Sequence, residues 1–205
     1  MSKKELYVLG DSISMGYGQF LEKMCETSMN YSRKSGEEEA LKNLDIPVGA
    51  NGGDSSRVLE YLNLLKKSGQ FKKDIMLINC GLHDLKADKE SGEKQVPLDL
   101  YRQNLEQLAN VAKELADCVV WINTTPVLFA VHHERKPFDR SEKDVIEYNK
   151  CADEIMAKAN IRIADLWSFT MSYQLDETIL ADGVHFCPEI QEKQAAFLAG
   201  YLNAI

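Results

Sequence analysis

Residue types that together can activate a hydroxyl group occur near the two ends of this sequence. Ser12 directly follows a short apolar run, Leu6–Leu9, and Asp11. Asp182 and His185 stand three residues apart near the carboxyl end. A serine becomes a nucleophile when an imidazole takes its proton and a carboxylate holds that imidazole in the right tautomer. Ser12, His185 and Asp182 are therefore a candidate nucleophile, base and orienting acid.

The spacing of Asp182 and His185 is weak evidence when taken alone. Because 32 of the 205 residues are Asp or Glu, the four histidines give about 0.6 such pairs by chance. A structural hydrogen bond near the start of a final helix explains the same pair. The spacing leaves both interpretations open.

Two further stretches could supply hydrogen-bond donors to a developing oxyanion. In Gly52-Gly53, a tight turn would expose a backbone N–H group, although the same glycines could simply precede a helix capped by Asp54 or Ser55. His83 could donate one hydrogen bond as a neutral imidazole, act as a competing base, or be satisfied by its own loop. Asp11 is expected to make local turn hydrogen bonds behind Ser12.

Other polar motifs predict structure rather than cofactor chemistry. The stretch His132-His133-Glu134-Arg135-Lys136 follows the fourth predicted strand, so we expect it near the proposed site. Its adjacent histidines do not match zinc-ligand spacings, so a solvated or substrate-facing loop is expected rather than the alternative, a metal site. Arg140 lies where the next helix begins, and a purely structural role is expected. The glycines at 10, 16 and 18 match no phosphate-binding motif. These patterns predict neither a metal nor a nucleotide cofactor.

Alternating strands and helices are expected to position the candidate residues. The apolar runs predict five strands, Leu6–Leu9, Ile46–Val48, Ile75–Asn79, Cys118–Asn123 and Ile161–Ala164. Helices are expected at roughly Gln19–Asn30, Glu37–Asn43, Ser55–Lys67, Leu98–Ala116, Glu142–Ala159 and Pro188–Ala204. Such alternation predicts an α/β fold whose five-stranded parallel sheet carries helices on both faces. The polar strand ends then meet at one edge of the sheet, where open α/β sheets bind ligands.

Composition limits the number of domains, the binding partners and the cellular location that are expected for this protein. A chain of 205 residues with 44% apolar and 27% charged residues is expected to form one domain over residues 1–205. The net charge of −8 argues against nonspecific binding to nucleic acid or an anionic membrane. Five cysteines without a CxxC pair predict free thiols. With no apolar signal segment at the start, we expect a cytoplasmic protein.

Four blocks, taken in order, resemble the GDSL or SGNH hydrolase superfamily. Gly10-Asp-Ser-Ile13 is similar to the nucleophile block and Asn51-Gly-Gly-Asp-Ser-Ser56 to the glycine block. Gly81-Leu-His-Asp84 stands where the family has Gly-x-Asn-Asp, and Asp182-Gly-Val-His185 is similar to the closing block. The order and strand-end placement of these blocks make the resemblance specific.

The resemblance implies a flavodoxin-like α/β/α sandwich and metal-free hydrolysis of esters. Nothing in the sequence marks a long apolar acyl tunnel, so we expect short acyl groups, such as acetyl groups on a carbohydrate or a similar polar molecule. It implies Ser12 as nucleophile, His185 as base and Asp182 as the orienting acid, with an acyl-serine intermediate. The backbone N–H groups of Ser12 and Gly53 would bind the oxyanion. The family's third donor is an asparagine, which is His83 here.

That departure leaves a second function open. A misplaced His83 would remove one oxyanion donor, which typically costs about 10²-fold in rate. The alternative is therefore a weakened or inactive SGNH-fold binding or regulatory module. A flavodoxin-like cofactor binder is a third interpretation.

Overall fold

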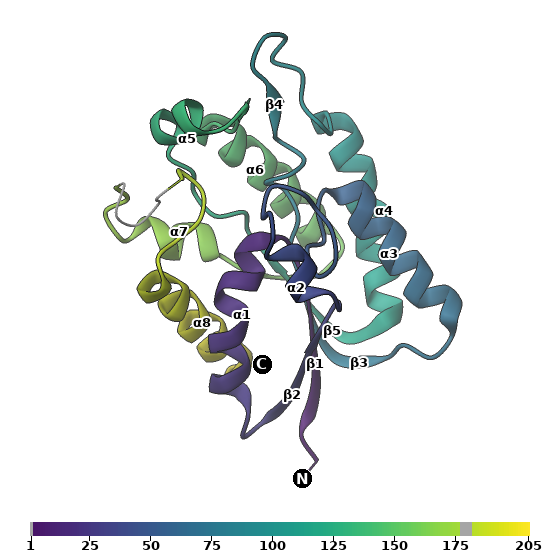
Figure 1. The fold of residues 1–205 in the computed structure, drawn as a ribbon. Coiled ribbons are helices and arrows are strands. Elements are labelled where there is room, and N and C mark those ends of the chain that lie inside the picture. The colour runs from purple at the N-terminus through teal and green to yellow at the C-terminus, as the bar shows by residue number, and fades with distance from the viewer. Residues whose placement is uncertain (1, 177–181) are drawn as a thin grey trace.

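A five-stranded parallel sheet forms the middle layer of the computed structural model, which describes residues 2–176 and 182–205 (Figure 1). Its strands are β1 (Lys4–Leu9), β2 (Met29–Arg33), β3 (Lys73–Ile78), β5 (Ala116–Ile122) and β7 (Arg162–Ala164). Their order in the sheet is β2-β1-β3-β5-β7, the flavodoxin-like order. The chain changes direction across the sheet between β1 and β3, so a ligand site is expected outside the carboxyl ends of these two strands.

Helices cover both faces of this sheet, as the α/β pattern predicts. They are α1 (Ser12–Cys25), α2 (Glu37–Ala40), α3 (Ser55–Ser68), α4 (Leu98–Leu115), α5 (Phe129–Arg135), α6 (Glu142–Lys158), α7 (Leu166–Met171) and α8 (Pro188–Asn203). In Figure 1, α1 and α8 pack together on one side of the sheet, and α3 and α4 pack together on the other. Among the described residues, no helix combines the length and the apolar character needed to span a bilayer.

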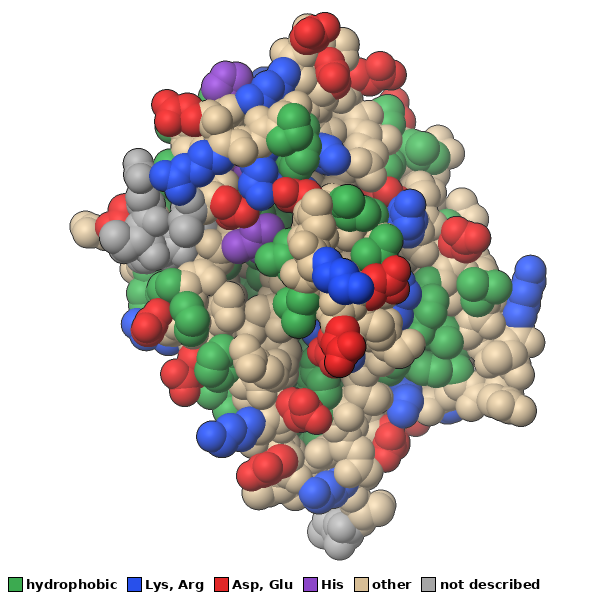
Figure 2. Space-filling model, viewed as in Figure 1, with side chains coloured by type: hydrophobic (Ala, Val, Ile, Leu, Met, Phe, Trp, Pro, Cys, Tyr) green, Lys and Arg blue, Asp and Glu red, His purple; other side chains and the backbone are tan. Residues whose placement is uncertain are grey.

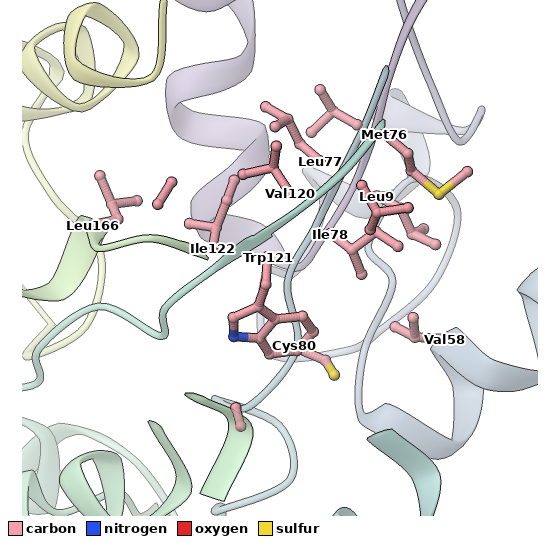
Figure 3. Close-up of a cluster of buried hydrophobic side chains, with 14 of the residues drawn as sticks. Leu9, Val58, Met76, Leu77, Ile78, Cys80, Val120, Trp121, Ile122 and Leu166 are labelled. Carbon is pink, nitrogen blue, oxygen red and sulfur yellow. The ribbon is translucent and has the colours of Figure 1, made fainter. Parts of the chain in front are cut away.

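The apolar core lies on both faces of the central strands (Figure 3). Met76, Leu77 and Ile78 of β3 are consecutive and fully buried. Such runs are typical of parallel strands that are covered by helices on both faces. Each large buried side chain contributes roughly 1.5–3 kcal/mol relative to leaving it in water. The core therefore fixes the sheet edge on which the candidate residues stand.

The prediction of a strand at Ile46–Val48 is wrong, because these residues form a loop. Pro47 has no N–H group to donate to a neighbouring strand, and the Asn43 side chain accepts a hydrogen bond from the Asp45 N–H group in a local turn. The second strand is instead β2, which pairs only with β1 at the edge of the sheet. An edge strand tolerates polar residues such as Asn30 and Ser32, so it lacks the continuous apolar run expected of a buried strand.

The first helix begins at Ser12, seven residues earlier than predicted. Asp11 caps it, and its side chain accepts a hydrogen bond from the Ile13 N–H group at 3.0 Å. Gly16 and Gly18 lie inside the helix, at positions where neighbouring side chains approach the helix backbone closely. A Cβ atom at Gly16 would lie 2.9 Å from Gln191 of α8, and one at Gly18 would lie 2.8 Å from the Tyr31 hydroxyl of β2.

The short elements β4 (Ala87–Asp88), α5, β6 (Phe138–Asp139) and α7 were not predicted. The stretch 132–134, expected as a loop, belongs to α5, and α7 follows β7 directly. The segment Lys86–Lys94 contains β4, which pairs with β6. These two strands have two residues each, and the helices α5 and α7 have seven and six, so they are too short to show a strand or helical period.

Candidate active site

Ser12 stands at the start of α1, immediately beyond the carboxyl end of β1. It is the first residue of the helix, where a backbone N–H group has no acceptor within the helix. The positive end of the helix dipole also favours negative charge at this position. Ser12 therefore combines a hydroxyl group with a backbone donor, and Asp11, in the local role predicted for it, fixes the turn beneath both.

The structure brings His185 from the far end of the chain to Ser12. The Ser12 Oγ atom lies 2.8 Å from His185 Nε2, although the two residues are 173 positions apart in sequence. His185 Nδ1 lies 2.7 Å from Asp182 Oδ2. A carboxylate can only accept hydrogen bonds, so Nδ1 carries the ring proton and Nε2 is left to accept the serine proton. The three residues predicted as nucleophile, base and orienting acid thus form one hydrogen-bonded chain.

The Asp182 carboxylate is fixed by more than the imidazole. Its Oδ1 atom accepts hydrogen bonds from the N–H groups of Val184 at 3.0 Å and His185 at 2.8 Å. Its Oδ2 atom also lies 3.1 Å from Lys136 Nζ. Burial alone would raise the pKa of Asp182, but the hydrogen bonds from His185 and Lys136 outweigh it and hold this pKa well below its usual range. Asp182 is therefore an anion at neutral pH.

Gly53 lies in the loop before α3, with a positive φ of 75° that favours glycine. Its N–H group donates to Asn51 Oδ1 at 3.0 Å, and the Gly52 N–H group donates to the Gly10 carbonyl at 2.9 Å. The second bond ties the glycine block to the end of β1, even though no strand precedes the block. Asp54 caps α3 by accepting from the Arg57 N–H group, so the capping interpretation is also confirmed.

His83 follows β3 and is almost completely buried, at 1% exposure. Burial, followed by the charges of Arg140 and Lys86, lowers its pKa from 6.5 to about 3. The imidazole is therefore neutral at physiological pH and can donate from one nitrogen only. Its Nδ1 atom is buried and has no hydrogen-bond partner among the described residues.

Polar and charged side chains to which the sequence analysis assigned no role in catalysis also lie near the site. Arg140, expected to be purely structural, is buried; its Nε atom donates to the Leu82 carbonyl at 2.7 Å, and Ser141 caps α6 instead. His132, expected in a solvated or substrate-facing loop, is fully buried and lies 3.4 Å from Arg140 Nη1. Asp45 and Lys136 form an ion pair beside Asp182. No local motif marks these residues, because they come from separate loops and helix ends.

A pocket of about 170 Å³ opens beside Ser12 and His185. Its walls come from α1, α8 and the loop after α2, and include Met15, Gly16, Leu41, Leu44, Phe186 and Gln191. In Figure 2, acidic and basic side chains lie next to a histidine near the middle of the visible face. In residues 2–176 and 182–205, no group of three or more His, Cys, Asp or Glu side chains could hold a metal ion. All five cysteines are free thiols, as predicted.

A model of the GDSL-like lipase/acylhydrolase family matches residues 8–193, which include all four sequence blocks. The chain belongs to this family. No curated protein matches it in sequence.

Solved structures show the same acylhydrolase fold at low sequence identity. A lipase/acylhydrolase from Enterococcus faecalis superimposes with a TM-score of 0.73 at 19% identity, covering 98% of this chain and 96% of that one. An acetylxylan esterase from Geobacillus stearothermophilus gives a TM-score of 0.68 at 16% identity, covering 98% and 93%. A GDSL-like lipase from Bacteroides thetaiotaomicron gives 0.67 at 16% identity, covering 98% and 89%. These likenesses establish the three-layer α/β/α fold.

Proposed function

We propose that this protein is a serine esterase that hydrolyses short-chain acyl esters through an acyl-serine intermediate. Ser12 Oγ attacks the ester carbonyl carbon while His185 Nε2 takes the serine proton. The imidazolium, stabilised by Asp182, then gives this proton to the departing alcohol oxygen, and the ester C–O bond breaks. A water molecule then attacks the acyl-serine carbonyl carbon while His185 takes its proton. The bond between the acyl carbon and Ser12 Oγ breaks, the acid is released, and His185 returns the proton to Ser12 Oγ.

The observation that carries this proposal is the hydrogen-bonded chain from Asp182 through His185 to Ser12. A hydroxyl beside an imidazole, with the other nitrogen of that imidazole beside a carboxylate, is the order that general-base activation of a serine requires. The membership of an acylhydrolase family supports the same chemistry.

Oxyanion stabilisation is assigned in this proposal to the backbone N–H groups of Ser12 and Gly53 and to the imidazole of His83. The Gly53 N–H group must then be shared between Asn51 and the oxyanion. Because His83 stays neutral, it contributes a single hydrogen bond and no full positive charge.

Small acyl groups fit the pocket beside Ser12. A cavity of about 150 Å³ is large enough for one benzene molecule, so a pocket of about 170 Å³ has room for a short acyl group. Acetyl esters of a carbohydrate or a similar polar molecule are the proposed substrates. The structural likeness to an acetylxylan esterase supports this choice.

A weakened or inactive binding module is the second candidate, and one observation favours it. Two of the three proposed oxyanion donors are constrained, since the Gly53 N–H group is already bonded to Asn51 and His83 is buried. This candidate predicts a folded protein that binds a polar ligand without turnover.

A panel of p-nitrophenyl esters from acetyl to decanoyl, together with acetylated sugars, tests the proposed function. We expect turnover of the short esters, little turnover beyond hexanoyl, and loss of turnover in Ser12→Ala with an unchanged circular dichroism spectrum. Equal turnover by the wild type and by Ser12→Ala would remove the nucleophile assignment. A folded wild type with no turnover of any ester would favour the binding module.

A further inference from the structure

A lysine outside the four sequence blocks joins two carboxylates at the active site. Lys136 Nζ lies 2.7 Å from Asp45 Oδ2 and 3.1 Å from Asp182 Oδ2. The side chains of Lys136 and Asp45 are 18% and 20% exposed, so this cluster is only partly open to water. Burial opposes ionisation of both groups, yet their mutual bonds raise the pKa of Lys136 and lower that of Asp45. All three groups are therefore charged.

The three groups come from different parts of the fold. Lys136 follows the last residue of α5, Asp182 precedes α8, and Asp45 belongs to the segment 41–48, here named the Asp45 loop. Lys136 is held at the end of α5 by a hydrogen bond from its N–H group to the His132 carbonyl at 3.0 Å. An ammonium group anchored in this way limits the movement of both carboxylates.

The Asp45 loop also forms one wall of the pocket beside Ser12, through Leu41 and Leu44. On its other side, the Leu44 carbonyl accepts a hydrogen bond from Asn51 Nδ2 at 3.2 Å, and Asn51 holds the Gly53 N–H group. One loop thus connects the pocket wall, the glycine block and, through Lys136, the triad carboxylate.

We propose that Lys136 is a positioning residue that fixes Asp182 toward His185 and, through Asp45, holds the pocket wall beside Ser12. This inference rests on the proposed esterase function. Lys136 touches neither the ester nor Ser12 in this account, because it acts through the two carboxylates. It lies outside the four sequence blocks.

If Lys136 and Asp45 act on the triad, removing either charge shifts the pH profile of kcat/KM. A merely structural ion pair would not have this effect. The ammonium group disfavours a second positive charge on the His185 ring, whereas the Asp45 carboxylate favours it. Removing Lys136 should therefore move the acid limb of the kcat/KM profile to higher pH, and removing the charge of Asp45 should move it to lower pH. The His185 ring interacts electrostatically with Asp11, Asp45, His83 and Asp182. Lys136 contacts Asp45 and Asp182, and Arg140 Nη1 lies 3.8 Å from Asp45 Oδ1.

Four variants test the proposal with p-nitrophenyl acetate across pH 5–9: Lys136→Met, Lys136→Arg, Asp45→Asn and Lys94→Met. Lys94 pairs with Asp144 and is 24% exposed, so it is a matched lysine outside the site. We expect Lys136→Met to move the acid limb up by about one pH unit, which lowers kcat/KM about tenfold on the acid side. Asp45→Asn should move this limb down and raise KM more than it lowers kcat, because the pocket wall loosens. Lys136→Arg should keep the wild-type limb, and Lys94→Met should match the wild type.

Identical profiles for Lys136→Met and Lys94→Met would overturn the proposal, as would shifts of the same sign in Lys136→Met and Asp45→Asn. Labelling of the same variants with a fluorophosphonate separates this failure from failure of the proposed function. If the wild type labels at Ser12 and Lys136→Met labels equally fast at every pH, only the role of Lys136 is contradicted. A wild type that neither labels nor turns over the ester contradicts both.

Discussion

At the residue scale, the chemistry depends on two short contacts around one imidazole. His185 Nε2 lies 2.8 Å from Ser12 Oγ, and His185 Nδ1 lies 2.7 Å from Asp182 Oδ2. The second contact decides the first, because it leaves Nε2 as the nitrogen that accepts the serine proton. Two backbone N–H groups hold the other Asp182 oxygen, so the carboxylate cannot rotate freely.

Replacing Asp182 by Asn should keep the side-chain shape and remove the charge. The amide no longer stabilises the imidazolium or enforces the right tautomer, so kcat for p-nitrophenyl acetate should fall by about 10³–10⁴-fold. The loss should appear in kcat more than in KM. A decrease of less than tenfold would show that Asp182 has only a structural role.

Substitutions of His83 test whether its imidazole is the third oxyanion donor. Both a neutral imidazole and a carboxamide offer an N–H group, so His83→Asn should keep kcat within about tenfold of the wild type, while His83→Ala should lose about 10²-fold. Steady-state kinetics at pH 8 measure both. Equal activity in His83→Ala and the wild type would exclude His83 from the oxyanion hole.

At the scale of elements, the start of α1 is what places Ser12. The helix begins immediately after β1, so the serine hydroxyl and the serine N–H group share one turn with the Asp11 cap. The close contact of α1 with α8 at Gly16 and Gln191 then brings the segment that carries His185 to the same edge.

Removing the Asp11 side chain, which caps α1, should lower the stability of the protein and displace Ser12. Asp11→Ala leaves the Ile13 N–H group without its acceptor, which costs about 1 kcal/mol of unfolding free energy. Because Ser12 is the next residue, kcat should also fall, whereas Asp11→Asn should retain most of both. Urea unfolding and ester turnover measure the two effects. A fully active Asp11→Ala variant would contradict the positioning role of the cap.

Sequence reasoning predicted the central strands and long helices because their patterns are long and strongly apolar or periodic. It missed β2, where an edge strand carries polar residues, and it placed a strand at Ile46–Val48, where Pro47 prevents pairing. It predicted Ser12 from a block directly after β1, and Asp182 and His185 from a block before the last helix. It placed the stretch that contains Lys136 near the site, but it could not predict the pairing of Lys136 with Asp45, which depends on how the end of α5 and the loop after α2 meet in space.

At the scale of the whole molecule, burial of uncharged histidines couples stability to pH. Burial and the nearby Arg140 charge lower the pKa of His132 from 6.5 to about 4. Between these values the unfolded chain takes up a proton and the folded chain does not, so stability is complete above about pH 6.5 and falls as the pH drops toward 4. His83 acts with the same sign.

His132→Gln keeps a polar side chain beside Arg140 and removes the titration. Between pH 7 and pH 4, the variant should lose about 1–3 kcal/mol less unfolding free energy than the wild type. Urea unfolding at the two pH values gives this difference directly. A wild type and a variant with the same pH dependence would show that His132 is protonated in the folded state.

The proposed mechanism depends on a covalent bond between the acyl group and the Ser12 hydroxyl oxygen. Intact-protein mass spectrometry after treatment with a fluorophosphonate, followed by peptide mapping, measures directly whether this oxygen forms a covalent bond. We predict a single adduct on Ser12 that is absent in Ser12→Ala and much slower to form in His185→Ala. A folded wild-type protein that stays unmodified, or an adduct on another residue, would contradict the account.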